Sequence, residues 1–257
     1  MAVEKAARLA KQGFRTLLTC FNKTLALDLR LRLGEIPNLD IIHFHELCYL
    51  LAEKADMLPE GTFDEQYFEK LLPEALIPAA DKLGVRYHAI VVDEGQDFQD
   101  HWWLPLQLLL EDPDEGILYI FFDDNQRIYV PDSTFPIPSP PHTLSVNCRN
   151  TQRIHEFILN FYQSPDRPLA RGPQGRPVEW VTYPDGSELR TRLHQVLEQL
   201  RQEGIPADEI AILPFTGKRK QQIWSDDLTD EWPPPADKVY CSTVQAFKGL
   251  ERSVIIL

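Results

Sequence analysis

The sequence has 257 residues, of which 43% are hydrophobic and 25% charged, as is usual for a globular protein of one large or two medium-sized domains. Its net charge of -13 argues against a protein that holds nucleic acid on a broad basic face, although a groove with a few local contacts stays compatible with it. No apolar run reaches the ~18 residues of a membrane span and the N-terminus has no apolar signal core, so we expect a cytoplasmic protein without membrane contact. The four cysteines are too far apart in sequence for a metal site and indicate reduced thiols.

Short apolar strands alternate with segments of helical periodicity, which is typical of an α/β fold with parallel sheets covered on both faces. In chain order we expect a helix at Val3–Gln12, a strand at Thr16–Cys20, a helix at Lys23–Leu33, a strand at Asp40–Phe44, a helix at Asp64–Leu83, a strand at His88–Val92, a helix at Gln99–Leu110 and a strand at Leu118–Phe122. The second half continues with a strand at Thr143–Val146, a helix at Gln152–Tyr162, a strand at Val178–Tyr183, a helix at Glu188–Glu203, and strands at Ile210–Leu213, Val239–Ser242 and Val254–Leu257. The helix at 188–203 is the clearest, because leucine and valine recur on one face and a glycine follows it.

A proline-rich stretch between residues 131 and 141 predicts a linker, since proline stiffens an extended chain and cannot donate to a sheet. Strands and helices alternate on both sides of it. We therefore expect two lobes, 1–135 and 136–257, with a small helical insertion near 45–83 in the first. The chain begins within a helix and ends on four apolar residues, so we expect a fragment of a longer protein.

Two carboxylates follow one of the buried-type strands. Residues 89–92 are apolar throughout, and Asp93 and Glu94 come directly after them. The carboxyl ends of strands are where open α/β sheets bind their ligands. In a nucleotide site, Asp93 would hold Mg²⁺ and Glu94 would orient or deprotonate the attacking water.

Two other interpretations of this pair stay open. Acidic residues are favourable near a helix start, so Asp93 and Glu94 could cap a helix that begins near Gln99. Metal-dependent nucleases also gather carboxylates. Many of them place a Glu-x-Lys near the metal, and no glutamate here is followed two residues later by lysine, which makes a nuclease less favoured.

Three later segments carry residue types that suit phosphoryl transfer. The amide of Gln126 could bond a γ-phosphate or the attacking water, although the segment 123–126 is also ordinary turn material. Arg149 stands at a strand-to-helix junction past the prolines, where it could stabilise developing charge or lie on the surface beside a helix cap. A turn at 243–251 contains Lys248, Gly249 and Glu251, which is a weak signal by itself.

Taken in order, these segments resemble the motifs of the UvrD/Rep-like superfamily 1 DNA helicases. Leu17–Lys23 resembles motif Ia, Val91–Asp97 motif II, Asp123–Gln126 motif III, Asn147–Asn150 motif IV and Thr243–Glu251 motif V. The resemblance covers nearly the whole chain, and its specificity comes from five motifs in the family's order. It implies an α/β fold of the P-loop NTPase type, with two RecA-like lobes, mainly parallel sheets, ATP and Mg²⁺ between the lobes, and single-stranded DNA or RNA across the top.

The resemblance also assigns roles to individual residues. The catalytic positions would be Asp93, which is also the metal ligand, Glu94, and the γ-phosphate sensors Gln126 and Arg149. The nucleotide would be faced from the second lobe by Lys248, Gly249 and Glu251. The candidate nucleic-acid positions are Phe21, Asn22, Tyr129, Thr243 and Gln245.

The sequence departs from the family pattern in several places. It contains no Gly-Lys-Ser/Thr phosphate-binding loop, which the family places directly before the helix that matches residues 1–12. The family's motif VI is expected after Val254–Leu257, where this sequence stops. Cys148 stands where relatives often have an aromatic residue, and the segment after Tyr129 lacks further aromatic residues. Residues 150–242 leave no room for the large domain that many relatives insert there.

These departures divide the functional expectation into two hypotheses. The first is the core of an ATP-dependent DNA helicase or translocase, which lacks the phosphate cradle and therefore does not hydrolyse ATP by itself. The alternative is a non-catalytic or regulatory RecA-like module that binds a partner or nucleic acid, which the acidic charge and Cys148 favour.

Overall fold

The computed structural model describes residues 1–126, 135–137, 140–162 and 167–257. The protein has an α/β fold in which every paired strand among these residues runs parallel to its neighbour. The described residues form two compact units. The first contains Met1–Asp123, Phe135 and Leu200–Leu257, and the second contains Asp124–Gln126 and the described part of Pro136–Gln199. The sequence analysis had placed 136–257 in one lobe, whereas Leu200–Leu257 belongs to the same unit as the N-terminal residues.

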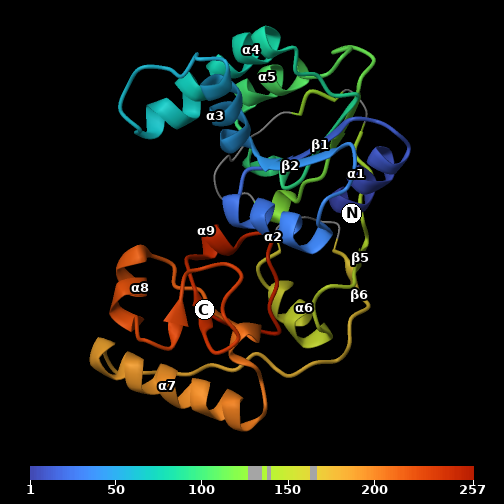
Figure 1. Ribbon diagram of the computed structural model, residues 1–257. Helices are drawn as coiled ribbons and strands as arrows, with labels where there is room; N and C mark the ends of the chain where they lie inside the picture. The colour runs from blue at the N-terminus through green and yellow to red at the C-terminus, as the bar shows by residue number, and fades with distance from the viewer. Residues whose placement is uncertain (127–134, 138–139, 163–166) are drawn as a thin grey trace. The chain divides into compact units, whose positions relative to one another are not determined.

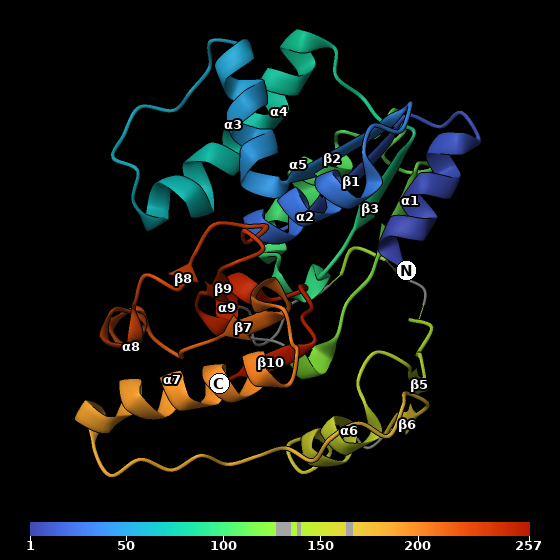
Figure 2. The same ribbon diagram turned by 60° about the horizontal axis from the view of Figure 1, so that its bottom comes forward.

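The first sheet has four strands in the order β2-β1-β3-β4 (Figures 1 and 2). Their bounds are Thr16–Cys20 for β1, Leu39–His43 for β2, Ala89–Val92 for β3 and Ile117–Ile120 for β4. In β1 and β3 every residue is buried, as expected for central strands of a parallel sheet that is covered on both faces. The end of β1 lies in register with the end of β3, because Thr19 is paired with Val92.

Helices cover both faces of this sheet (Figure 1). One face packs on α3 (Phe44–Lys54), α4 (Leu72–Leu83) and α5 (Trp103–Gln107) in a core that contains Leu17 and Ile90. The other face packs on α1 (Ala2–Lys11) and α2 (Lys23–Leu33) in a core that contains Leu18 and Val91. Neighbouring strand residues thus enter opposite cores, which follows from the alternation of side chains along a strand.

A second parallel sheet completes the first unit, with strand order β10-β7-β9-β8. Its strands are short: Ile210–Ile212 for β7, Leu228–Thr229 for β8, Val239–Cys241 for β9 and Val254–Ile256 for β10. The helices of this region are a 3₁₀ turn at Ala207–Glu209, α8 (Gly217–Ile223) and α9 (Val244–Phe247). Tyr240 and Phe247 belong to the same core as α1 and α2, so both sheets contribute to one hydrophobic cluster.

The second unit is smaller and has little sheet. Strand β5 (Val146–Asn147) pairs with β6 (Leu169–Ala170), and α6 (Gln152–Ile158) lies between them in sequence. Helix α7 (Gly186–Gln202) follows, and its last residues from Leu200 belong to the first unit. A 3₁₀ turn spans Asp124–Gln126.

Most expected elements are confirmed within a few residues, and three differ. The expected strand at Val178–Tyr183 is wrong: these residues are unpaired and exposed, and Trp180 is 79% exposed. Apolar alternation alone does not make a strand when no neighbouring edge is available for pairing. The helix expected at Asp64–Leu83 is interrupted by a π-helix at Tyr67–Leu71, and the helix expected at Gln99–Leu110 is reduced to a 3₁₀ turn at Asp100–Trp102 and α5.

No helix in the described parts of the chain is long and apolar enough to cross a membrane.

Candidate functional site

The loop that follows β3 makes a sharp turn against the end of β4. Glu94 has a left-handed backbone with φ 55° and ψ 44°, which costs free energy for a residue with a side chain. The N–H of Gly95 donates to the carbonyl of Phe121 at 2.8 Å. A Cβ at position 95 would lie 2.5 Å from Cγ2 of Ile120, so only glycine fits here. The turn places the side chains of Asp93 and Glu94 at the carboxyl edge of the sheet.

Gln96 holds the carboxylate of Glu94. Its side-chain nitrogen Nε2 donates to Oε2 of Glu94 at 2.6 Å, and its Oε1 accepts the backbone N–H of Asp123 at 3.1 Å. Gln96 is fully buried, so the link is shielded from water. The sequence analysis assigned no role to Gln96. Its position two residues after the glutamate, in the polar loop after a buried strand, was the available signal.

Lys248 reaches this loop from the turn after α9. Its ammonium Nζ lies 2.6 Å from Oδ1 of Asp97 and 3.8 Å from Oε2 of Glu94, and the Lys248 and Asp97 side chains are 4% and 1% exposed. Burial raises the pKa of Asp97, and the hydrogen bond and charge of Lys248 act in the opposite direction. Lys248 therefore joins the loop after β3 to a segment 151 positions away in sequence.

Asn22 makes a second connection between the same parts of the chain. Its Oδ1 accepts the N–H groups of Thr24 and Leu25 at 2.8 and 3.3 Å, which caps helix α2. Its Nδ2 lies within hydrogen-bond distance of three carbonyls at the end of α9: those of Gln245 (3.3 Å), Ala246 (3.1 Å) and Lys248 (3.0 Å). The Asn22 side chain thus forms hydrogen bonds with N–H groups at the start of α2 and with carbonyls at the end of α9.

These contacts border a cavity of about 270 Å³ in the first unit. It is lined by eight residues: Phe21, Asn22, Lys23, Asp97, Thr243, Gln245, Ala246 and Lys248. Four of the five positions that the sequence analysis proposed for nucleic acid are among them. The fifth, Tyr129, lies outside the described residues. The hydroxyl of Thr243 also accepts the N–H of Ala246 at 3.3 Å, so it caps α9 as well as lining the cavity.

Gly249 and Glu251 lie next to Lys248 in the first unit but do not line this cavity. Gly249 has φ +82°, and a Cβ there would come within 2.6 Å of Cδ2 of Leu25, which explains the need for glycine by close packing on α2. The side chain of Glu251 is exposed. Gln126 and Arg149 belong to the second unit; Gln126 is exposed, and the N–H of Arg149 donates to Oδ1 of Asn147 at 3.1 Å.

The interpretation of Asp93 and Glu94 as caps of a helix near Gln99 is wrong. The helical turn at Asp100–Trp102 has Gln99 as its N-cap and no side-chain cap, and the 3₁₀ turn at Gly95–Asp97 that precedes it has Glu94 at the N-cap position, again without a side-chain hydrogen bond. Oδ1 of Asp93 instead accepts the N–H of Glu94 at 3.1 Å. The pKa of the Cys20 thiol, at the end of the neighbouring strand β1, is raised mainly by burial. The negative charges of Asp93 and Glu94 raise it further.

The donor set at this edge suits a hard cation better than a soft one. No group of three or more His, Cys, Asp or Glu side chains in the described ranges is arranged to hold a metal ion. Mg²⁺, however, is usually bound by one or two carboxylates and completed by water and phosphate oxygens. Asp93 with Glu94 fits that requirement.

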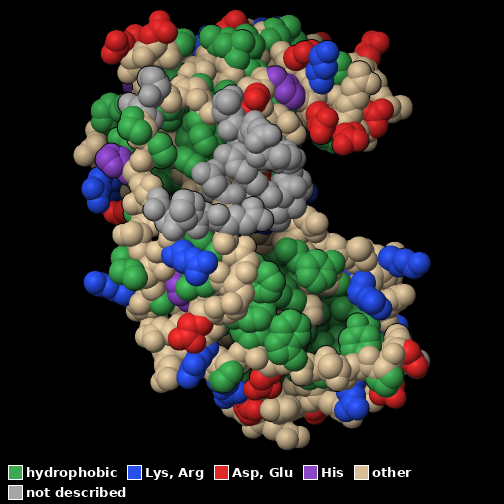
Figure 3. Space-filling view, turned by 180° about the vertical axis from the view of Figure 1, so that it is seen from behind, with side chains coloured by type: hydrophobic (Ala, Val, Ile, Leu, Met, Phe, Trp, Pro, Cys, Tyr) green, Lys and Arg blue, Asp and Glu red, His purple; other side chains and the backbone are tan. Residues whose placement is uncertain are grey.

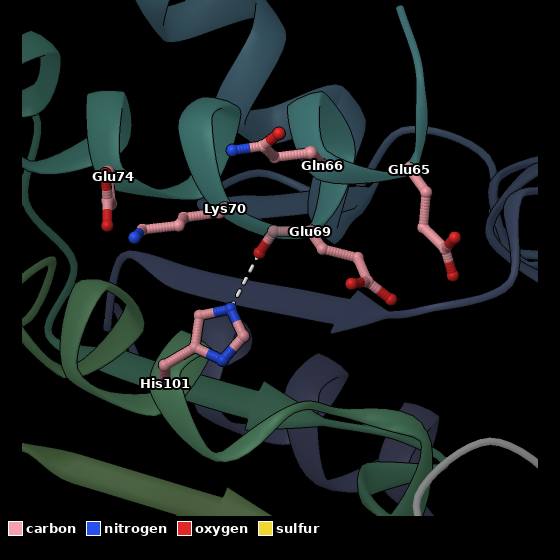
Figure 4. Close-up of a pocket in the computed structure, with 6 residues that line it drawn as sticks. All are labelled: Glu65, Gln66, Glu69, Lys70, Glu74 and His101. Atoms are coloured by element: carbon pink, nitrogen blue, oxygen red, sulfur yellow. Dashed lines mark hydrogen bonds between the residues drawn. The ribbon is translucent and has the colours of Figure 1, made fainter.

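A larger cavity, of about 560 Å³, lies elsewhere in the first unit (Figure 4). Its lining is highly charged and comprises Glu65, Gln66, Glu69, Lys70, Glu74 and His101. None of the positions proposed from the sequence lines it. Figure 3 shows Lys and Arg side chains scattered among acidic and apolar ones on the described part of one face.

No protein-family model matches the sequence, and no curated protein matches it either.

Proposed function

We propose that the chain is a core segment of an ATP-dependent DNA helicase or translocase of the UvrD/Rep-like type, in which movement on single-stranded DNA is coupled to ATP hydrolysis. One observation carries this proposal. The segments that resemble motifs Ia, II and V, at Leu17–Lys23, Val91–Asp97 and Thr243–Glu251, meet around one cavity and are joined by the contacts of Asn22 and Lys248. As part of this proposal, the chain folds as two RecA-like lobes and the protein is cytoplasmic.

In this proposal the carboxylates at the end of β3 divide the work. Asp93 would hold Mg²⁺, and Glu94 would orient the attacking water and accept its proton. Mg²⁺ and ATP, when bound, supply the metal charge and the phosphoryl group. Gln96 keeps the carboxylate of Glu94 in place, because a buried amide at 2.6 Å restricts its rotation. The ammonium of Lys248 lies 3.8 Å from the same carboxylate oxygen and is a second contact that holds it in position.

The cavity beside these carboxylates is proposed to take one or a few nucleotides of a single strand. Phe21 offers an aromatic ring for base stacking, and Lys23 is an exposed cation for the backbone. The cavity is lined by two lysines, of which Lys248 is paired with Asp97. This small local charge agrees with a net charge of -13, because local contacts rather than a basic face would hold the strand.

Binding is tested directly by fluorescence anisotropy with a labelled oligothymidine of about 16 nucleotides, the upper range of site sizes for small single-strand-binding folds. We expect saturable binding that weakens with added salt, and weaker binding of the same length of duplex. Absence of binding to either form at low salt contradicts the proposal.

Turnover of ATP is expected to be at background in this chain, with or without single-stranded DNA. The 257 residues contain no Gly-Lys-Ser/Thr loop, so the backbone amides and lysine that cradle the phosphates are missing from them. A steady-state phosphate-release assay checks this. Turnover that is abolished by Glu94→Gln would show that phosphate binding is supplied by other residues.

A non-catalytic module is the second candidate. It is favoured by the contacts of Glu94, whose carboxylate already takes the Gln96 amide at 2.6 Å and lies 3.8 Å from Lys248. In this hypothesis the loop after β3 only stabilises the fold, and the chain binds nucleic acid or a protein without using ATP. Equilibrium dialysis with Mg²⁺ and ATP separates the two, because only the first candidate predicts that Asp93→Ala weakens Mg²⁺-dependent nucleotide binding.

A further inference from the structure

Two aromatic side chains support the ring of Phe21 at the cavity. The indole of Trp102 is stacked on it, with ring centroids 5.7 Å apart and planes 20° from parallel. The imidazole of His45 meets it edge-on, with centroids 5.7 Å apart and planes at 72°. His45 and Trp102 also contact each other, at 4.9 Å and 88°. The three rings form a closed triangle, which leaves the Phe21 ring few alternative rotamers.

Both supporting rings are anchored on consecutive carbonyls of the π-helix at Tyr67–Leu71. Nε1 of Trp102 donates to the carbonyl of Glu69 at 2.8 Å, and Nε2 of His45 lies 2.8 Å from the carbonyl of Phe68. His101 adds a contact of 2.7 Å to the carbonyl of Glu69, drawn in Figure 4. The π-helix is therefore tied to the aromatic triangle by three side chains.

The sequence explains why these two carbonyls accept side-chain donors. Residue 73 is proline, so the carbonyl of Glu69 meets no N–H at the spacing of an α-helix. The N–H of Leu72 donates to the carbonyl of Tyr67, five residues back, instead of to Phe68. Pro73 and the π-helix thus expose acceptors that an uninterrupted helix would have used internally.

We propose that Trp102 and His45 are positioning residues, which hold the Phe21 ring as a preset platform for stacking a base of single-stranded nucleic acid. This inference rests on the proposed function and goes beyond it, because it extends the binding site to the helix at residues 67–83. A ring that is already fixed loses little conformational freedom when a base stacks on it, so the stacking free energy is retained as affinity.

Neighbouring tryptophans provide a matched test. Trp102 and Trp103 lie in the same core and are 2% and 3% exposed, but Nε1 of Trp103 has no hydrogen-bond partner among the described residues. Trp102→Phe removes the hydrogen bond to Glu69 and shrinks the surface under Phe21. Trp103→Phe removes the same atoms from a ring that stacks on Phe98 instead, at 5.1 Å.

The measurement is the affinity for the labelled oligothymidine, with thermal melting as a parallel readout. Phe21→Ala is expected to weaken binding about fivefold to a hundredfold, the range for the loss of one stacked base. Trp102→Phe is expected to weaken it about two- to tenfold, the range for one lost hydrogen bond, while Trp103→Phe leaves it unchanged. In the Phe21→Ala background, Trp102→Phe is expected to add nothing, which a general loss of stability would not reproduce.

The outcomes separate the two proposals. If the wild type does not bind, or if Phe21→Ala binds as well as the wild type, the proposed nucleic-acid site is wrong. If Phe21→Ala weakens binding but Trp102→Phe does not, or if Trp102→Phe weakens it equally without Phe21, the positioning role is wrong. Should Trp102→Phe not fold, His45→Gln is the second variant: it keeps a donor for the carbonyl of Phe68, loses the ring edge, and must weaken binding only when Phe21 is present.

Discussion

At the scale of single residues, the ion pair of Lys248 and Asp97 is the least expected feature. Sequence reasoning assigned Lys248 to the nucleotide, whereas its ammonium lies on a carboxylate that is 1% exposed. Two charges taken out of water contribute little net stability as a pair, but each becomes costly when its partner is removed. The pair therefore fixes the loop after β3 and the end of α9 to each other.

Lys248→Met is expected to lower the free energy of unfolding by about 3–5 kcal/mol, because it leaves the Asp97 carboxyl buried without its partner. The double variant Lys248→Met/Asp97→Leu removes both charges and is expected to recover a large part of this loss. Urea unfolding followed by circular dichroism measures both. A double variant less stable than Lys248→Met would mean that the pair itself, and not the unpaired charge, determines the stability.

His43 gives a prediction for pH. Burial lowers its pKa to about 4 from the ordinary 6.5, although Glu46 acts in the opposite direction. The folded protein then binds this proton less readily than the unfolded chain, so the free energy of unfolding decreases as the pH falls from 6.5 to about 4. We expect His43 to contribute on the order of 2 kcal/mol of this decrease.

The control for His43 is His43→Asn, which keeps an acceptor for the N–H of Glu46 at the start of α3 but does not titrate. Stability curves of the two proteins should run parallel above pH 6.5 and diverge below it. Curves that stay parallel down to pH 4 would assign the acid sensitivity to other groups.

At the scale of elements, the strands around the candidate site could be predicted, and the connections between them could not. Apolar runs such as Thr16–Cys20 are short and bounded by polar residues, and their length favours a buried strand over a helix. The π-helix at Tyr67–Leu71 depends on Pro73 and on partners far away in sequence, which local periodicity does not report. The exposed segment at 178–183 has the same apolar alternation as a strand but pairs with no strand among the residues that the structure describes.

Gly95 tests the turn after β3. Gly95→Ala places a Cβ 2.5 Å from Cγ2 of Ile120 and is expected to destabilise the protein by about 1–3 kcal/mol, the usual cost of overpacking. Gly217→Ala at the start of α8 is the matched control, because nothing lies within 4 Å of its Cβ position. Urea unfolding of both proteins checks this, and equal stabilities would show that the turn adapts to a side chain.

At the scale of the whole molecule, the sequence motifs name residues that line one cavity but do not predict the contacts between them. Phe21, Asn22, Thr243 and Gln245 were proposed from resemblance, and they line one cavity. The links of Gln96 to Glu94 and of Asn22 to the end of α9 follow from the packing of α2 and both sheets, which no linear pattern encodes. Gln126 and Arg149 belong to the second unit, and their role stays a prediction.

We propose that the ends of β1, β3 and β9 form one binding site for single-stranded nucleic acid. Hydrogen–deuterium exchange of this chain with and without oligothymidine tests it most directly, because it reports every segment at once. We predict slower exchange in peptides that cover residues 20–24 and 242–249 together. If saturating oligothymidine slows exchange only at residues 65–74, or slows it at neither 20–24 nor 242–249, the strand does not bind at the ends of β1, β3 and β9.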